Sequence, residues 1–458
     1  MNSIKNLSLL AVAISSVLLT GCGDAETTIN ELPPIEDHDD HDHDDDHDGE
    51  DHDHDAESSG RLMIADADSN AMAVFDLEDN SLLDTFSVTH SGSALTHSAD
   101  YRFAVVSSRT NDLVEFIDGG VWREDHVDHM HDYEEAPALS DFSLVGSQPT
   151  HVVSHDGQLA VFFDGNADTS MPASVQVVSD NDIATEANDI PTLTYSVNMH
   201  GVAKPVDDML IATVRRDDAE SVSANPVLPD SVGIYHWHDG EYEQEQLFAG
   251  ECPDLHGAAL NEEFVVLGCS DGVLVLHAHD EEYESQKVSN IDELNGMRVG
   301  SVYAHHDVDT FIGVASQHGG GSAVITAIDP DHGEMEVINW EPETDAHPVS
   351  YGFSYDGEYF LILDDKGHLT VLSAEAHDDH EHWELTSRIH FSEEDLNSMP
   401  DNAGFSMSVA QNAPLVYITD PIAQHVLIID LEHGETEGDI ELDFVPSAIT
   451  WLGIAEAH

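Results

Sequence analysis

Short apolar runs separated by turns rich in Asp and Gly recur along the chain from Gly60 onward. The repeating unit is a short strand, a turn, a strongly apolar strand, a second turn and a third apolar strand. Its period of about 45 to 55 residues is that of a four-stranded propeller blade. No helical periodicity of useful length accompanies it, so the pattern predicts one all-β domain, a β-propeller. Seven internal copies begin at Ser93, Thr150, Met199, Leu255, Tyr303, Ser350 and Phe405.

The two ends of the repeat array are incomplete in complementary ways. The segment RLMIADADSNAMAVFDLE, from Arg61, has a second and a third strand but no first strand, whereas VPSAITWLG, from Val445, has only a first strand. Pairing of these N- and C-terminal strands completes a blade and removes two exposed sheet edges. We therefore predict eight blades over residues 60–458. Seven blades are the alternative, because the segment 297–329 matches the repeat least well.

The start of the chain has the features of an export signal. Lys5 precedes an apolar run over residues 7–19 and the sequence LTGC, which ends at Cys22. A basic start, a short apolar stretch and small residues are typical of such signals, and this stretch is too short to span a membrane. The pattern resembles a bacterial lipoprotein signal peptide with its lipobox, which implies removal of residues 1–21 and lipidation of Cys22. Because Gly23 follows instead of aspartate, we expect an outer-membrane anchor facing the periplasm; an uncleaved helix is the alternative.

Residues 22–59 form the predicted tether, and within it six histidines are interleaved with fourteen carboxylates between Glu36 and Glu57. Imidazole is a common ligand for zinc, nickel and copper, and His-rich tracts favour metal binding. This tract has nothing to bury, so we expect it to stay disordered and to hold ions loosely. The alternative is an acidic spacer. The expected weak ligands are His38, His41, His43, His47, His52 and His54.

The whole chain is strongly acidic, with 12 basic residues against 93 acidic ones and a formal net charge of −81. Such a surface excludes nucleic acid as a natural partner and disfavours docking on anionic lipid head groups. Because salt screens the self-repulsion of such a surface, we interpret the acidity as adaptation to a salty medium. We expect a monomer.

Two cysteines remain once Cys22 is lipidated, and the expected compartment is oxidising. Cys252 and Cys269 flank a segment that is typical of two antiparallel strands joined near residues 261–263. The ends of such a hairpin lie side by side, so we predict a disulfide between the two cysteines. A thiolate metal site is the alternative.

Three histidines fall at equivalent positions of consecutive repeats. In a propeller the first strand of every blade faces the central channel, so equivalent positions form a ring. His200 in NMHGVAKP and His256 in DLHGAALN occupy the same position, each before a glycine, and His151 in QPTHVVSHD lies close to the same level. Zinc takes three or four such ligands, held by further hydrogen bonds. We predict a metal site from these three residues; histidines merely hydrogen-bonded or solvated at strand ends are the alternative.

Other histidines and carboxylates are weaker candidates. The fourth ligand of the channel site is expected among a set whose members the sequence does not rank: His155, Asp254, His347 and the pair His305 and His306. The segment VWREDHVDHMHDYEE offers a second site, a loop chelate of His126, His129 and His131, or else an exposed acidic insertion. A similar arrangement recurs in EAHDDHEHWE, with His377, His380 and His382.

Taken together, these features resemble the periplasmic zinc metallochaperones of the AztD type. The resemblance covers nearly the whole mature chain, and its most telling segments are QPTHVVSHDGQLAVFFDG, NMHGVAKP and CPDLHGAALNEEFVVLGCSDGVLV. It implies a β-propeller with a flexible His-rich N-terminal segment that passes zinc to the solute-binding protein of an ABC importer. By the same resemblance His151, His200 and His256 are the tight site. The lipobox and the acidity depart from the family, so a mobile shuttle and a tethered reservoir both stay open.

We expect the tract to capture zinc through many weak contacts and the channel site to hold it more tightly, a step that tethering makes intramolecular. Acidification should empty both sites, because imidazole binds metal only when neutral. No further nucleophile or cofactor motif indicates an enzyme. Two other classes stay open: a metal-dependent propeller enzyme, such as a lactonase or a quinone-dependent dehydrogenase, and a scaffold lipoprotein like the eight-bladed component of outer-membrane barrel assembly. Cobalt, nickel and copper bind similar ligand sets.

Overall fold

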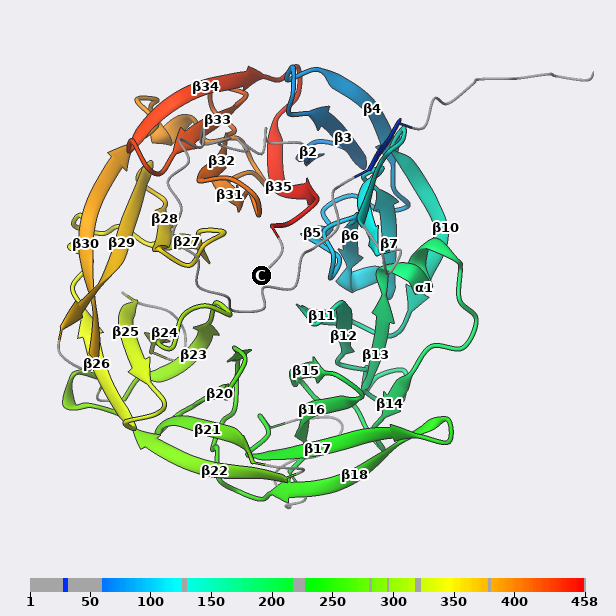
Figure 1. Ribbon diagram of the computed structural model, residues 1–458, viewed down its shortest axis with the longest axis vertical. Helices are drawn as coiled ribbons and strands as arrows, with labels where there is room; N and C mark the ends of the chain where they lie inside the picture. The colour runs from blue at the N-terminus through cyan, green and yellow to red at the C-terminus, as the bar shows by residue number, and fades with distance from the viewer. Residues whose placement is uncertain are drawn as a thin grey trace, which may run out of the picture.

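Eight four-stranded antiparallel sheets are arranged in a ring around a central channel (Figure 1). The structure is a computed structural model that describes residues 28–31, 60–125, 130–216, 227–279, 282–294, 296–317, 323–377 and 380–456. The predicted signal peptide, Cys22 and the six tract histidines lie outside these residues. Eight blades are therefore confirmed, and the weakly matching segment 297–329 supplies three strands of a complete blade.

The blades are numbered here in the order of the ring, each from its inner to its outer strand. Blade 1 consists of β35 (Pro446–Gly453), β2 (Gly60–Asp66), β3 (Ala71–Asp76) and β4 (Leu82–Ser87). Blade 2 consists of β5 (Ala94–His97), β6 (Phe103–Ser108), β7 (Leu113–Asp118) and β10 (Ala138–Val145). Blade 3 consists of β11 (Pro149–His155), β12 (Gln158–Phe163), β13 (Ser174–Ser179) and β14 (Thr192–Thr194). Blade 4 consists of β15 (Ala203–Val206), β16 (Met209–Val214), β17 (Ser231–His238) and β18 (Glu241–Phe248).

The second half of the ring continues in the same way. Blade 5 consists of β19 (Ala258–Leu260), β20 (Phe264–Cys269), β21 (Gly272–His279) and β22 (Glu282–Ser289). Blade 6 consists of β23 (Arg298–Tyr303), β24 (Phe311–Ser316), β25 (Val324–Asp329) and β26 (Glu334–Ile338). Blade 7 consists of β27 (Pro348–Phe353), β28 (Tyr359–Asp364), β29 (His368–His377) and β30 (His380–His390). Blade 8 consists of β31 (Ser406–Val409), β32 (Leu415–Asp420), β33 (His425–Asp430) and β34 (Glu435–Glu441).

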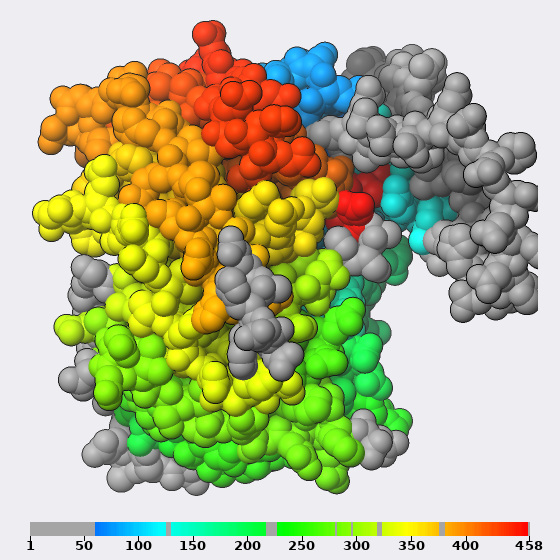
Figure 2. Space-filling view, turned by 60° about the vertical axis from the view of Figure 1, so that its left-hand side comes forward, coloured from blue at the N-terminus to red at the C-terminus, as the bar shows by residue number. Residues whose placement is uncertain are grey.

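The ring closes in blade 1 as the incomplete repeats predicted. Strand β35 pairs antiparallel with β2, with Trp451 opposite Leu62. Both side chains are buried in the apolar cluster that joins blades 8 and 1. The red C-terminal and blue N-terminal segments accordingly meet in both views (Figures 1 and 2). Closure by these two strands pairs the edges that an open ring would expose.

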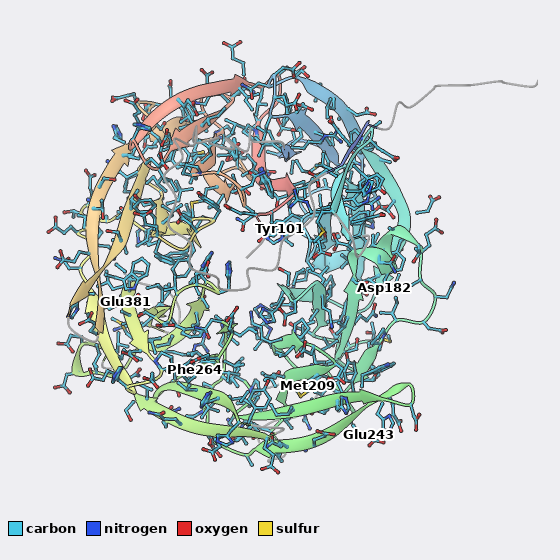
Figure 3. All side chains as sticks on the ribbon, in the orientation of Figure 1. Tyr101, Asp182, Met209, Glu243, Phe264 and Glu381 are labelled. Carbon is cyan, nitrogen blue, oxygen red and sulfur yellow. A yellow bond between two sulfur atoms is a disulfide. The ribbon has the colours of Figure 1, made fainter. Side chains whose placement is uncertain are left out.

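The hydrophobic core lies between the blades. The middle strands are rich in Val, Ile, Leu and Phe, which favour strands; β6, for example, reads FAVVSS and is buried throughout. Each apolar cluster combines neighbouring blades, as where Ile234 of blade 4 packs with Leu267 of blade 5. Outer strands such as β4 are largely exposed. In Figure 3 Tyr101 lies near the channel, whereas Glu243 lies on the outer rim.

The hairpin β8–β9 is inserted into blade 2 between β7 and β10, and pairing of β9 with β1 from the N-terminal part of the chain makes a three-stranded sheet. It consists of β8 (Val121–Asp125), β9 (Met130–Glu134) and β1 (Thr28–Glu31) in the order β1-β9-β8. Trp122 stacks on Tyr133 with ring centroids 5.0 Å apart, and the guanidinium of Arg102 lies 3.7 Å from the ring centroid of Trp122. These contacts hold the base of the β8–β9 hairpin on blade 2.

Helices are short and few among the described residues. The α-helix α1 (Asp180–Ala184) begins after Ser179, whose side chain caps it. Three 3₁₀ turns are η1 (Arg109–Asn111), η2 (Asp292–Leu294) and η3 (Leu396–Ser398). Within the described ranges, no helix has both the length and the apolar character needed to cross a membrane.

The inner strands all run in the same direction along the channel. Residues at or just after their ends line one cavity of about 1110 Å³, including Tyr101, His155, Asp207, His306 and Gln411. His151 in the first half of β11, and His200 and His256 just before β15 and β19, belong to the starts of these strands. The channel therefore has two distinct mouths, which we call the start mouth and the end mouth.

Candidate metal centre

Three imidazoles from three consecutive blades converge at the start mouth. One ligand atom from each of His151, His200 and His256 lies within 4.8 Å of the others, and all three residues are half-buried. The Nε2 atoms of His151 and His200 are 3.3 Å apart. The ring of His256 lies 5.7 Å from that of His151 and 5.2 Å from that of His200, measured between centroids. The structure thus brings together the three histidines that were predicted as ligands.

Local backbone features place each of these histidines. A register shift between Pro149 and His151 interrupts the β11–β12 ladder just where His151 enters the channel. A side chain at Gly201 would collide with Thr213, and one at Gly257 would collide with the carbonyl of Gly300. Gly257 also has a φ of +77°, which favours glycine. The glycines after His200 and His256 therefore allow the close approach of neighbouring strands that the site requires.

Two of the histidines donate their second ring nitrogen to fixed acceptors. His200 Nδ1 lies 3.1 Å from Oδ2 of Asp164, and His256 Nδ1 lies 2.7 Å from the carbonyl oxygen of Gly300. A ring that donates from Nδ1 carries its lone pair on Nε2, the atom that can bind a metal. These hydrogen bonds fix both the tautomer and the ring orientation, as is usual around a bound metal ion.

Asp164 is a functional residue that the sequence analysis missed. It directly follows β12 and is buried. Its Oδ2, the oxygen that faces His200, also forms a 2.8 Å ion pair with Arg109. Its other carboxylate oxygen, Oδ1, is buried without a hydrogen-bond partner among the described residues. The available signal was an aspartate at the end of an otherwise apolar second strand, VFFDG, beside the start of the next blade.

The electrostatics of the site favour the neutral rings of His151 and His256. Burial lowers the pKa of His151 to about 4, and the neighbouring His200 and His256 contribute further to this shift. Burial is also the main cause that lowers the pKa of His256. A neutral ring keeps the lone pair that binds a metal, whereas a protonated ring has none. Three imidazole nitrogens, with the tautomers of His200 and His256 fixed by hydrogen bonds, fit the ligand set that zinc accepts.

The expected fourth ligands are not brought to this group. His155 ends β11, four residues beyond His151, which is about 13 Å along a strand, and its Nε2 contacts Asp156 at 3.1 Å. His305 and His306 follow the end of β23 and line the end mouth. Asp254 and His347 do not belong to the group of ligand atoms that lie within 4.8 Å of one another. The exposed His347 instead contacts Asp365 at 3.2 Å.

The two other predicted histidine clusters are only partly described. His126 and His129 lie outside the described residues, whereas His131 is in β9, opposite Glu124 of β8. His377 and His380 end β29 and begin β30, and their side chains are outside the described set. Nδ1 of His382 lies 2.7 Å from a carboxylate oxygen of Glu336 on the neighbouring blade. The loop site therefore stays a prediction.

The predicted disulfide is present beside the site. Cys252 and Cys269 are joined, and both are buried. Strands β19 and β20 pair antiparallel on either side of residues 261–263, as predicted. The bridge ties the segment before His256 to the end of β20, and the backbone N–H of His256 donates to the carbonyl of Gly268 in the same strand. The position of His256 is thus fixed by a covalent bond and by a hydrogen bond.

Comparison with known proteins, like the geometry of the three histidines, indicates a zinc-binding protein. No protein-family model matches the chain. The zinc chaperone AztD of Citrobacter koseri is 24% identical over 404 residues, which are 86% of this chain and 86% of that protein. The structure of apo AztD from the same organism aligns with a TM-score of 0.69 and 21% identity, covering 87% of this chain and 99% of that one.

Two further structures share the fold. A crystal structure of Citrobacter koseri AztD aligns with a TM-score of 0.67 and 21% identity, covering 87% of this chain and 100% of that one. The dihydro-heme d1 dehydrogenase NirN in complex with DHE aligns with a TM-score of 0.52 and 10% identity, covering 85% of this chain and 74% of that one. These likenesses show a common architecture. In sequence over most of its length, and in its fold, this chain is similar to the zinc chaperones of the AztD type, as the sequence motifs indicated.

Proposed function

We propose that this protein is a periplasmic zinc chaperone that captures zinc, holds it at the start mouth and passes it to the solute-binding protein of a zinc ABC importer. The observation that carries the proposal is the convergence of His151, His200 and His256 within 4.8 Å. Similarity to the zinc chaperone AztD over most of the chain supports the same role. Zinc is here the cargo, and no catalytic step is proposed.

The chain's own groups suggest how the ion is handled. The acidic surface and the His/Asp tract raise the local concentration of cations, and the three imidazoles then bind an ion with ligands already oriented. Asp164 and the Gly300 carbonyl hold two of the rings in place while the ion enters or leaves. Three nitrogen ligands leave one position of a tetrahedral ion for a group of the acceptor protein. Transfer by a shared-ligand intermediate follows from that open position.

The membrane anchor is a separate part of the proposal. We propose that the chain is lipidated at Cys22 and acts as a monomer at the outer membrane, facing the periplasm. A Cys22→Ser variant should then move from the detergent phase to the aqueous phase in a detergent-partition experiment. Equal partitioning of this variant and the parent would contradict the anchor and would leave the zinc site untouched.

The decisive experiment measures zinc binding by calorimetry on three forms of the chain. The parent should show one tight site and several weak ones. Replacing His151, His200 and His256 by Ala should remove only the tight site, and replacing the six tract histidines by Gln should remove only weak ones. A matched control replaces three histidines outside the site that each face a carboxylate, namely His236, His332 and His433.

A transfer assay separates a chaperone from a storage protein or a scaffold. The zinc-loaded chain is mixed with the metal-free importer protein in the presence of a chelator. Direct transfer predicts that the acceptor gains zinc at a rate that does not depend on chelator concentration. If the chelator intercepts the zinc, the transfer role is wrong even where tight binding is found, and if the triple alanine variant binds as tightly as the parent, the metal site itself is wrong.

A further inference from the structure

The end mouth carries a second histidine cluster that the proposed function does not use. It lies in the turn after β23, where His305, His306 and Asp307 are consecutive in the chain. One ligand atom from each lies within 4.8 Å of the other two. Both histidines line the cavity at the ends of the inner strands, and both are half-buried. This position is separated from the three start-mouth histidines by the length of the inner strands.

The hydrogen bonds of His305 prepare one of its nitrogens for metal binding. Its Nε2 lies 2.9 Å from the carbonyl oxygen of Tyr355, so Nε2 carries the proton. The lone pair is therefore on Nδ1, which accepts the backbone N–H of Asp307 over a longer 3.2 Å. His200 and His256 use the same arrangement, in which one ring nitrogen donates to a fixed acceptor and the other holds the lone pair.

The other two groups of the turn complete a mixed ligand set. The ring of His306 lies 4.0 Å from that of His305 between centroids, and its Nε2 is 2.9 Å from Oδ2 of Asp307. A side chain at Gly357 would collide with Nδ1 of His305, so the absence of one allows the next blade to lie against this turn. Two imidazoles and one carboxylate are ligands that zinc and similar divalent metals accept.

The surrounding charge favours a cation at this mouth. The cavity that contains His305 and His306 is also lined by the carboxylates of Asp156, Asp207, Glu262 and Glu263. Among the described residues that line it, none is a lysine or an arginine. A concave surface of one charge sign concentrates ions of the opposite sign. The turn therefore lies where divalent cations gather.

We propose that His305, His306 and Asp307 form a second divalent-metal site at the end mouth, which takes zinc more weakly than the site at the start mouth. Binding replaces the Asp307 N–H as the partner of His305 Nδ1 and breaks the contact between His306 and Asp307. At the start mouth the ligands come from three blades, and fixed acceptors hold two of the rings. At the end mouth all three ligands belong to one turn and must exchange the contacts that they make with one another. The site stands independently of transfer to any acceptor.

The test uses the full-length chain in which the six tract histidines are replaced by Gln and His151, His200 and His256 by Ala. The other candidate ligands are also replaced by Gln, namely His126, His129, His131, His377, His380 and His382. Zinc alone, and Co²⁺ as a spectroscopic probe, are titrated into this background. One metal equivalent should bind, with a Co²⁺ spectrum typical of nitrogen and oxygen ligands. Adding His306→Ala and Asp307→Ala should remove that equivalent, whereas adding His332→Ala and Asp329→Ala, a matched His–Asp pair of another turn, should not.

Three outcomes would overturn the proposal. The background chain binds no metal equivalent, or the equivalent survives the His306 and Asp307 substitutions, or Mg²⁺ displaces zinc at similar concentrations, which would indicate a purely carboxylate site. Folding is checked by introducing the same two substitutions into the parent chain, where the tight start-mouth site should keep its affinity. If the proposed chaperone function is wrong, the parent chain lacks tight zinc binding or fails to transfer zinc. Neither result depends on the His305 site, so the two failures can be told apart.

Discussion

The two mouths of the channel gather histidines in different ways. At the start mouth three blades contribute one imidazole each, and at the end mouth a single turn contributes three consecutive residues. At the start mouth His151 lies in the packed strand β11, and hydrogen bonds to Asp164 and Gly300 hold His200 and His256, whereas the end-mouth ligands share one short turn. Ligands on rigid elements are held more precisely than ligands on loops. The comparison predicts that the same residue types bind an ion tightly at the start mouth and more weakly at the end mouth, according to the elements that carry them.

The largest effect should come from removing one start-mouth ligand. His200→Ala takes away the nitrogen that faces His151 at 3.3 Å and leaves two imidazoles to hold the ion. We expect zinc affinity to fall by more than about 100-fold, the upper end of the effect of removing a supporting group. Competition with a chelating dye measures the change. A loss below about tenfold would mean that the three rings do not act as one site.

Removing the support of that ligand should have a smaller effect. Asp164→Ala deletes the carboxylate that orients His200 but keeps all three imidazoles. Loss of such an orienting partner weakens metal affinity by about 10- to 100-fold. Asp180→Asn is the matched control, because Asp180 is another buried aspartate, with its hydrogen bond to Ser98, away from the site. Equal zinc affinities of the Asp164 and Asp180 variants would show that His200 needs no orientation from its carboxylate.

Removing the disulfide should weaken zinc binding at the start mouth and leave zinc binding at the end mouth unchanged. Replacing Cys252 and Cys269 by Ala frees the segment before His256, and closing a loop of sequence separation 17 stabilises a fold by about 3 kcal/mol. We expect a lower denaturant midpoint and less than about tenfold weaker zinc binding at the start mouth, with the His305 site unchanged. Equal weakening of zinc binding at both mouths would indicate that the whole ring has loosened. It would contradict the view that the disulfide supports the start mouth alone.

The pH dependence should be the smallest effect. Because burial lowers the pKa of His151 to about 4, this ring stays neutral until the pH approaches that value, and the pKa of His256 is lowered in the same direction. Three ordinary imidazoles would lose on the order of 50-fold in affinity between pH 7.5 and pH 6 from proton competition. At the start mouth we expect zinc affinity to fall by less than about tenfold over the same pH range. A full 50-fold loss in calorimetry would show that the buried rings titrate normally.

Much of this architecture follows from local patterns in the sequence. The blade count, the composite first blade and the disulfide all depend on repeats and on hairpins whose partners are near in sequence or marked by a missing strand. His200 and His256 were identifiable because equivalent repeats place equivalent residues on one ring. His151 was found in the same way, although a register shift in β11 sets its final position.

The remaining parts depend on contacts that have no local signature. His155 and His151 lie on the same strand, and only the strand's length and direction reveal that they face opposite mouths. Asp164 meets His200 because the end of a second strand lies beside the start of the next blade, and the carbonyl of Gly300 meets His256 because of the backbone path of blade 6. Such pairings depend on the packing of neighbouring blades, which repeat spacing alone does not specify.

The pairing of β2 with β35 also sets an order of events during folding. As the chain is synthesised, β2 emerges long before β35, so its inner edge waits without a partner while the other blades assemble. An unpaired strand edge is a template for pairing with another chain, and distant pairings form slowly. The net charge of −81 makes unfinished molecules repel one another during this interval. The acidity that gathers cations around the finished ring thereby also protects the unfinished ring from aggregation.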